Sequence, residues 1–292
     1  MLTVKTILVP IVFADPSRHV VHQAAWLARR FHAEMILLHV LTPFSYPAGM
    51  LEGGHEITAR DLQAHIVQQS QQELDEALHP ELDGIQVTRM LIRGDAVEEI
   101  VKTARDRNAG LIVMSTRGHG AFYRFLVGSV TGKILHESPC PVWTGAHLEE
   151  DAPAREFSIR NVLCAVNLTE HSRHTASLAA EMAAAVDAKL TLVHITGGVE
   201  VLGPGGDHID PAWQETIIGF AASEIAKLQQ DVGTKAEVII DSGNVLELLD
   251  RAAEQSTADV LVIGHTLVYG HLGQNGNGYG IIRASRIPVL SV

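Results

Sequence analysis

Apolar residues are arranged in two alternating ways along the chain, as short unbroken runs and as longer stretches with helical spacing. Residues 6–12 form a continuous apolar run, and residues 34–41 form a second apolar-rich segment. Such runs are typical of parallel strands that are covered on both faces. Between them, residues 17–32 carry apolar side chains at helical spacing. The alternation predicts βαβ units, and therefore a parallel sheet with helices on both sides.

The same alternation continues to residue 144. Further helices are expected over residues 60–78, 96–108 and 129–137, and further strands over 85–92, 111–115 and 141–144. In the first of these helices we expect four side chains to form a core stripe, namely Leu62, Ile66, Leu74 and Leu78. In open sheets of this kind, ligands bind beyond the carboxyl ends of the strands, where the strand order reverses.

The whole pattern occurs twice. Ser17-Arg18-His19 recurs as Ser172-Arg173-His174, an offset of 155 residues. The offset is 149 where Gly94 matches Gly243, and 147 where the final strands match, because the intervening loops differ in length. A duplicated domain is expected to show such changes at loops. We predict domains at residues 1–147 and 158–292, joined by a polar, proline-containing linker at 148–157.

Composition narrows the class of protein. The chain has 292 residues, of which 46% are apolar, and a formal net charge of -12. This apolar content excludes a disordered chain, and no apolar run approaches the ~18–20 residues of a membrane span. The net negative charge argues against nucleic-acid binding. The N-terminus does not resemble a secretory signal, and Cys140 and Cys164 are expected to be small buried residues in a reducing compartment. We therefore expect a soluble cytoplasmic protein with neither a membrane nor a nucleic-acid partner.

One segment combines glycines with the expected start of a helix. Met114-Ser115-Thr116-Arg117-Gly118 is followed by nine residues and then by Gly128-Ser129. Glycines let a backbone approach an anion closely, and a helix N-terminus presents amide groups to it. Arg117 and His119 would add charge-assisted hydrogen bonds. Two interpretations stay open from these residues, a phosphate site or a glycine turn followed by an ordinary serine cap.

Several segments of the first copy resemble the universal stress protein family. They are ILVP at the first strand, LLHV at the second, RGDAVEEI after the third, and GSVTGKIL with a final CPVW. The nucleotide motif of the family is Gly-x-x-Gly, nine residues, then Gly-Ser or Gly-Thr. In this chain Ser115 replaces the first glycine. The resemblance implies two tandem open parallel-sheet domains of the α/β class, Rossmann-like and of the adenine nucleotide α hydrolase-like kind.

The resemblance also implies a ligand, ATP or AMP, with Mg2+ as an optional companion of ATP. Carried over by position, the binding residues are Pro10, Ile11, Val12, Val40, Met114, Ser115, Arg117, Gly118, Gly128, Ser129 and Val130. Val12 is a departure, because the family pattern places an aspartate near the nucleoside there. Asp15 would take over this role from the loop, or it is a turn residue, which is the favoured interpretation.

The second copy is more degenerate. Gly264 stands where the first copy has Ser115, Leu267 replaces the second glycine of the motif, and Asn167 matches Val12. The glycine-rich run at residues 270–280 is interpreted as a flexible loop rather than an anion site. We therefore expect the second copy to be mainly a structural partner that has lost the ATP site.

Other candidate chemistry is excluded or left as structural. His171-x-x-His174 lacks a third ligand, so surface histidines are favoured over a metal site. His39 and His194 occupy matching strand positions and are interpreted as hydrogen-bonded core histidines. No catalytic residues are recognised. The expected function is nucleotide binding in stress adaptation, against two alternatives, a nucleotide-free interaction module or a slow ATP hydrolase. The two copies are expected to pair as an internal pseudo-dimer, with a further homo-dimer left open.

Overall fold

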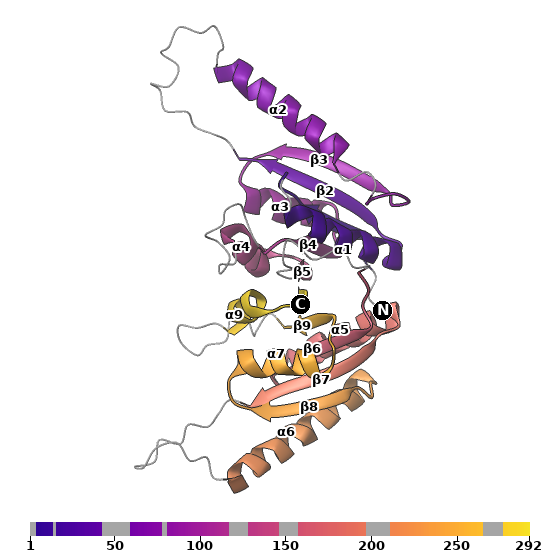
Figure 1. Cartoon of the computed structure of the whole chain (residues 1–292), viewed down its shortest axis with the longest axis vertical. Helices are drawn as coiled ribbons and strands as arrows, with labels where there is room; N and C mark the ends of the chain where they lie inside the picture. The colour runs from indigo at the N-terminus through magenta and orange to yellow at the C-terminus, as the bar shows by residue number, and fades with distance from the viewer. Residues whose placement is uncertain are drawn as a thin grey trace, which may run out of the picture. The chain divides into compact units, whose positions relative to one another are not determined.

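The chain folds into two compact units, each with its own parallel sheet and helices on the faces of that sheet (Figure 1). The computed structural model describes residues 4–13, 16–42, 59–77, 81–116, 128–145, 157–196, 211–264 and 277–292. Of these, residues Val4 to Val142 belong to one unit and Trp143 to Val292 to the other. We call them the N-terminal unit and the C-terminal unit.

The N-terminal unit follows the predicted order of elements. They are β1 (Thr6–Pro10), α1 (Pro16–Phe31), β2 (Glu34–Leu41), α2 (Ala59–Glu76), β3 (Val87–Arg93), α3 (Ala96–Asp106), β4 (Leu111–Met114), α4 (Ser129–Glu137) and the start of β5 (Val142–Thr144). The strand order is β3-β2-β1-β4-β5. β1 pairs in parallel with β2 on one side and with β4 on the other. The predicted α/β class with a parallel sheet is confirmed.

The C-terminal unit repeats this arrangement. Its elements are β6 (Asn161–Ala165), α5 (Ser172–Val186), β7 (Lys189–Thr196), α6 (Pro211–Val232), β8 (Glu237–Ser242), α7 (Val245–Gln255), β9 (Val260–Ile263), α9 (Asn277–Ala284) and β10 (Val289–Ser291). The strand order is β10-β9-β6-β7-β8, and the pairs are parallel. β6 therefore takes the central position that β1 holds in the first copy.

The central strands form the core of each unit. Ile7, Leu8 and Val9 of β1 are fully buried, and so is Leu163 of β6. Helix α1 packs against β1, β2 and β4, as α5 packs against β6, β7 and β9. Because helices cover both faces of these strands, their sequences are continuous apolar runs rather than alternating apolar and polar residues.

Helix caps at equivalent positions mark the duplication. The Asp95 carboxylate accepts hydrogen bonds from the amides of Val97 and Glu98 at 2.9 and 3.1 Å, and so begins α3. Asn244, at the same position of the second copy, accepts from the amides of Leu246 and Glu247 and begins α7. Both side chains satisfy amides that lack an intrahelical acceptor.

The expected core stripe of α2 is wrong in its first half. Leu74 is fully buried, but Leu62 and Ile66 are only half-buried, and Leu78 lies outside the described residues. The contact is concentrated at the helix end because Arg89 of β3 donates there, to the carbonyls of Leu74 and Ala77 at 3.0 and 3.2 Å. α2 also packs on β3, which is an edge strand with little sheet beyond it to cover.

The two cysteines differ in their surroundings. Cys164 of β6 is fully buried, as expected, and burial raises the pKa of its thiol to about 12. Cys140 is only half-buried, because it lies in the turn before β5. Burial also raises the pKa of this thiol, partly offset by a hydrogen bond from Ser138. Among the helices that the structure describes, none is both long and apolar enough to cross a membrane.

The buried thiol makes stability depend on alkaline pH. In the unfolded chain Cys164 loses its proton near pH 9.0, whereas in the folded chain it keeps the proton to about pH 12. Raising the pH above 9 therefore favours the unfolded state. Between pH 8 and pH 10 the free energy of unfolding should fall by about 1.4 kcal/mol more in the native chain than in Cys164→Ala. Urea denaturation at both pH values measures the difference, and parallel curves would contradict it.

Candidate functional site

In open α/β sheets a crevice is expected where the strand order reverses, and in the N-terminal unit this point lies between β1 and β4. From β1 the chain first builds outward through β2 and β3, and then returns to place β4 on the other side of β1. The carboxyl ends of β1 and β4 therefore flank the point where the strand order reverses. This is the position at which open α/β sheets bind ligands. Pro10 and Met114, two predicted site residues, are the last residues of these strands.

The connection from β4 to α4 is tied together at its two ends. The Gly128 amide donates to the Thr116 carbonyl at 3.0 Å. The buried Thr131 hydroxyl donates to the Ser115 carbonyl, also at 3.0 Å. Of the predicted site residues, Arg117 and Gly118 lie outside the described residues, as does His119. The two hydrogen bonds place the start of α4 directly beside the end of β4.

Helix α4 begins without a side-chain cap. Gly128 is the N-cap residue and has no side chain with which to cap, and Ser129 is the first helical residue and is exposed. The alternative in which Ser129 caps the helix is therefore wrong by one position, because the Gly132 amide already donates to the Gly128 carbonyl. The amides of the first turn have no acceptor within the helix, and the helix dipole adds positive potential there.

A histidine holds the residue that follows β1. The Nδ1 atom of His39, from β2, lies 2.9 Å from the Ile11 carbonyl oxygen, which requires the proton on Nδ1. The Ile11 amide donates to the Leu38 carbonyl at 2.9 Å, and its side chain is 6% exposed. The carbonyl, the amide and the side chain of Ile11 are therefore all fixed by the sheet. Its chain neighbours, Pro10 and Val12, are positioned as a result. The Phe13 ring covers His39 with a centroid separation of 4.3 Å.

The neighbouring predicted residues form an apolar wall at this edge. The Val12 side chain is 44% exposed, whereas Pro10 and Val40 are half-buried and Met114 is buried. Val12 places an exposed apolar side chain beside the crevice and provides no carboxylate. Ser115 is half-buried at the start of the connection to α4, and Val130 lies half-buried in the first turn of that helix.

The C-terminal unit uses the same histidine device. His194 Nδ1 lies 2.7 Å from the Val166 carbonyl oxygen, and the Val166 amide donates to Val193 at 2.9 Å. The interpretation of His39 and His194 as hydrogen-bonded histidines is confirmed, but both are half-buried at the edge of the core rather than within it. The repeated motif Leu38-His39-Val40 and Val193-His194-Ile195 carried this signal, although the sequence did not show that the partner is the carbonyl after the central strand.

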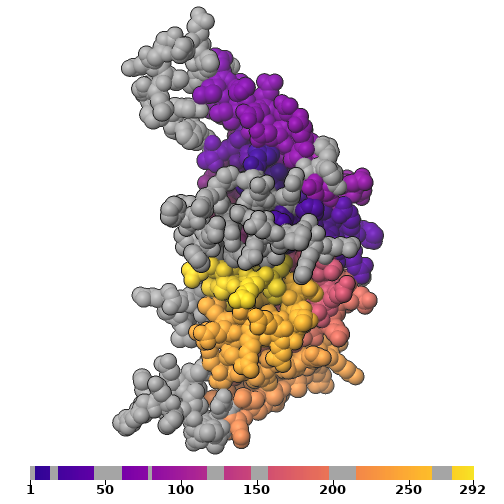
Figure 2. Space-filling view, viewed as in Figure 1, coloured from indigo at the N-terminus to yellow at the C-terminus, as the bar shows by residue number. Residues whose placement is uncertain are grey.

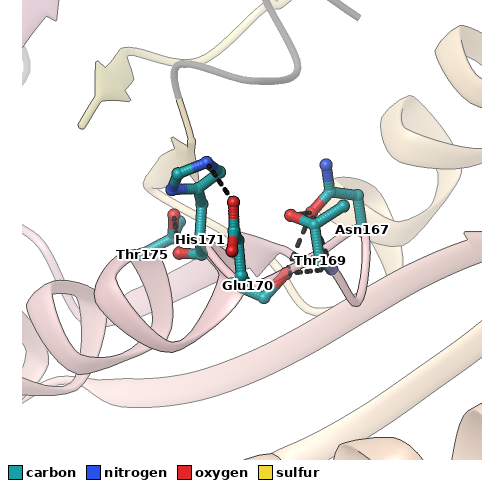
Figure 3. A network of polar contacts seen from close by, with 6 residues as sticks. Asn167, Thr169, Glu170, His171 and Thr175 are labelled. Atoms are coloured by element: carbon teal, nitrogen blue, oxygen red, sulfur yellow. Dashed lines mark hydrogen bonds and ion pairs between the residues drawn. The ribbon is translucent and has the colours of Figure 1, made fainter.

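Beyond this shared histidine contact, the C-terminal edge has a polar network of its own around Asn167 (Figure 3). Asn167, the counterpart of Val12, turns its amide oxygen toward the start of α5. This oxygen accepts from the hydroxyls of Thr169 and Ser172, each at 2.9 Å. Ser172 also accepts from the Thr169 amide at 3.1 Å. Asn167 is therefore committed to organising the β6–α5 turn.

The glycine-rich run at residues 270–280 is helical in its last part. Helix α9 begins at Asn277, so the expectation of a flexible loop is wrong there. Residues 265–276, including Leu267, lie outside the described residues.

The histidine pair His171 and His174 does not form a metal site in the described part of the chain. His171 lies 3.5 Å from the Glu170 carboxylate, and both side chains are largely exposed. Within the described residues, no group of three or more His, Cys, Asp or Glu side chains could hold a metal ion.

The fold defines a tandem protein of two open parallel-sheet domains. The chain belongs to the universal stress protein family, whose model matches residues 3–144 and again residues 158–292. The two separate matches confirm the tandem arrangement that the internal repeat predicts.

Individual relatives agree with this assignment. A universal stress protein of Methanocaldococcus jannaschii is 28% identical over 139 residues, which are 47% of this chain and 79% of that protein. One from Mycolicibacterium smegmatis is 26% identical over 211 residues, covering 72% of this chain and 68% of its own. The crystal structure of a universal stress protein from Archaeoglobus fulgidus shares the fold, with a TM-score of 0.65 at 19% identity, over 99% of this chain and 96% of that one.

The paired histidines give a prediction about stability. His39→Leu and His194→Leu each remove the donor to a carbonyl that follows a central strand. An unsatisfied buried carbonyl costs about 1–3 kcal/mol, so each variant should lose that much free energy of unfolding. His174→Leu, on an exposed histidine of α5, is the control and should change stability by less than about 0.5 kcal/mol. Urea denaturation measures all three. Equal stability of His39→Leu and His174→Leu would contradict the role of the histidine.

Proposed function

We propose that the N-terminal unit binds one adenine nucleotide, ATP or AMP, and that the chain acts in stress adaptation as a nucleotide-binding protein without catalysis of its own. The observation that carries this proposal is the tied β4–α4 connection at the switch point of the sheet. There the hydrogen bonds from Gly128 and Thr131 bring a helix N-terminus against the end of a strand. A phosphate chain fits this arrangement because the amides and the dipole of a helix N-terminus favour anions.

The conformation of Gly128 supports a phosphate at this position. Its φ of -56° and ψ of 147° are accessible to any residue, so the backbone does not require glycine. A Ser, Thr, Asp or Asn side chain at this N-cap would satisfy a helix amide. A glycine in its place leaves that amide without a side-chain cap, next to the exposed Ser129. The absence of a side chain is thus better explained by a bound group than by the fold.

The nucleoside would lie against the ends of β1 and β2. Val12 and Val40 offer an apolar surface there, and the residue between Pro10 and Val12 is fixed by His39. Without an aspartate at position 12, the binding free energy must come mainly from the phosphate end and from apolar contact. Nucleotide selectivity would accordingly rest on backbone groups near Val12.

The C-terminal unit is proposed to bind no nucleotide. Its counterpart of Val12, Asn167, accepts hydrogen bonds from Thr169 and Ser172 within its own turn. Leu267 replaces the second motif glycine in the sequence. The proposed stoichiometry is therefore one nucleotide per chain.

Three further possibilities concern what accompanies or replaces nucleotide binding: a Mg2+ ion, slow hydrolysis of ATP, and an interaction module without nucleotide. Mg2+, if it accompanies ATP, would rely on phosphate oxygens and water, because no acidic cluster that could hold it lies among the described residues. A slow ATP hydrolase would release inorganic phosphate in the presence of magnesium. A nucleotide-free interaction module would carry no nucleotide through purification, and mass spectrometry of the purified chain separates it from a binder.

We further propose, from the sequence alone, that the two domains divide at 1–147 and 158–292 around a 148–157 linker, that they pair as an internal pseudo-dimer, and that the protein is cytoplasmic. A further homo-dimer would add a second copy of the chain. Size-exclusion chromatography with light scattering distinguishes one chain from two.

The first test of this function is Gly128→Val. A valine would occupy the space proposed for the phosphates and should weaken ATP binding about a hundredfold, which corresponds to ~2.8 kcal/mol. Gly219→Val is the matched control, because Gly219 lies on exposed helix α6 with open space around its Cβ position. Isothermal titration calorimetry with ATP measures both. Undiminished ATP binding by folded Gly128→Val would exclude this phosphate site.

The second test restores the missing carboxylate. Val12 is 44% exposed, so an aspartate at this position keeps contact with water and is not stranded in the core. A new hydrogen bond to the nucleoside contributes about 0.5–1.5 kcal/mol, so Val12→Asp should tighten ATP binding by up to about tenfold.

Inorganic triphosphate provides the comparison for this variant. It lacks a nucleoside, so its affinity should not rise in Val12→Asp. The same change for ATP and for triphosphate would show that position 12 does not face the nucleoside.

A further inference from the structure

A cavity lies in the C-terminal unit, between α7 and α9. It has a volume of about 540 Å³, within the range typical of small-molecule sites. Its walls are mostly apolar, with Leu246 and Leu249 from α7, Leu261 from β9 and Ile281 from α9. The surfaces of α7, in orange, and α9, in yellow, adjoin in Figure 2. We call this cavity the α7–α9 groove.

Charges surround the groove unevenly. Three carboxylates follow α7 along it, those of Glu247, Asp250 and Glu254, whereas Arg286 is the one cation among the described residues of the lining. Arg286 lies 3.8 Å from the Asp250 carboxylate and 3.6 Å from that of Glu254. The Arg286 side chain is 75% exposed, and such exposed pairs contribute little. The lining therefore keeps an excess of negative charge.

The duplicated domain shows that the fold does not require this groove. At the 149-residue offset, the counterparts of Leu246, Asp250 and Ala253 are Val97, Val101 and Ala104 of α3. These three α3 side chains are 1–6% exposed. Their α7 counterparts are half-buried. This face of the helix is thus covered in α3 of the N-terminal unit and partly exposed in α7 of the C-terminal unit.

Asp250 is the substitution that matters most in this comparison. It stands where Val101 is 5% exposed in the first copy. An ionised carboxylate is costly inside a core, so this position is compatible with an open groove and not with a closed one. It places a negative charge at the border of an apolar cavity, where a cation with an apolar body would satisfy both features.

We propose that the α7–α9 groove binds a small amphipathic cation, with its alkyl or aryl body against the half-buried Leu246 and Ala253 and its ammonium group at the Asp250 carboxylate. The charge of the lining selects the cation over an anion of the same shape, because three carboxylates there outnumber the single guanidinium of Arg286 among the described residues. The site lies in the unit that is proposed to lack a nucleotide, so it is independent of the β4–α4 site.

The experiment compares two probes with the same tail, octylammonium and octanoate, titrated into the full chain below their micelle concentrations. Ligand-detected NMR gives the two affinities. We expect octylammonium to bind at least tenfold more tightly than octanoate. Equal affinities, or no binding of octylammonium at millimolar concentration, would overturn the proposal.

Variants place the binding in the groove. Ala253→Leu fills the cavity from α7, and Ala284→Leu fills it from α9 should the first variant fail to fold; either should reduce octylammonium affinity at least tenfold. Asp250→Asn should reduce the preference for the cation, because it removes the carboxylate proposed to face the ammonium group. Asp231→Asn, on exposed α6, is the charge-matched control and should retain it.

Two results with the variants would also contradict the proposal. Unchanged octylammonium binding in folded Ala253→Leu and Ala284→Leu would place the probe elsewhere. A second copy of the chain seated in the groove would appear as concentration-dependent dimerisation that Ala253→Leu abolishes, and this would replace the small cation as its occupant.

Discussion

The candidate site depends on one constraint, the fixed position of the first residues after the central strand of each unit. In a parallel sheet the chain must leave every strand at the same edge, and the first residues after the central strand decide where the edge begins. A histidine from the neighbouring strand fixes this point twice in the chain, by His39 to the Ile11 carbonyl and by His194 to the Val166 carbonyl. Because the carbonyl is held, the residue that follows it has a defined position, whether Val12 or Asn167.

The two copies differ mainly at positions outside the shared helix caps and the shared histidine hydrogen bonds. The helix caps Asp95 and Asn244 and the two histidines are equivalent, so both copies keep the same sheet. At the edge, Val12 is exposed beside the crevice, whereas Asn167 is engaged in its own turn. On the face of the second sheet, Asp250 replaces a buried valine and accompanies an open groove. The two units thus share one fold but differ in the surfaces at the strand ends and on α7.

Much of the fold could be predicted from the sequence, for physical reasons that are visible in particular residues. Ile7, Leu8 and Val9 form a continuous apolar run because both faces of β1 are covered, and the repeat fixed the element order of both units. The stripe on α2 was wrong, because side-chain spacing does not show that Arg89 ties only the end of this helix to the sheet.

The candidate site was predictable in part. The glycine motif located the β4–α4 connection, but the N-cap fell on Gly128 rather than on Ser129, since a cap depends on backbone angles that the residue type does not fix. The hydrogen bond from Thr131 to Ser115 joins residues on either side of the loop, and no local pattern indicates it. The α7–α9 groove was not predicted either, because it depends on how two helices pack.

We propose that one edge of this duplicated fold binds a nucleotide and that the other does not. Amide hydrogen exchange of the full chain with and without ATP, combined with the number of nucleotides bound at saturation, tests it most directly. We expect one ATP per chain, with slower exchange at the amides of Ser129 and Val130 and no change at Gly264 and Asn167. Two equivalents, or protection at the C-terminal edge alone, would contradict the claim.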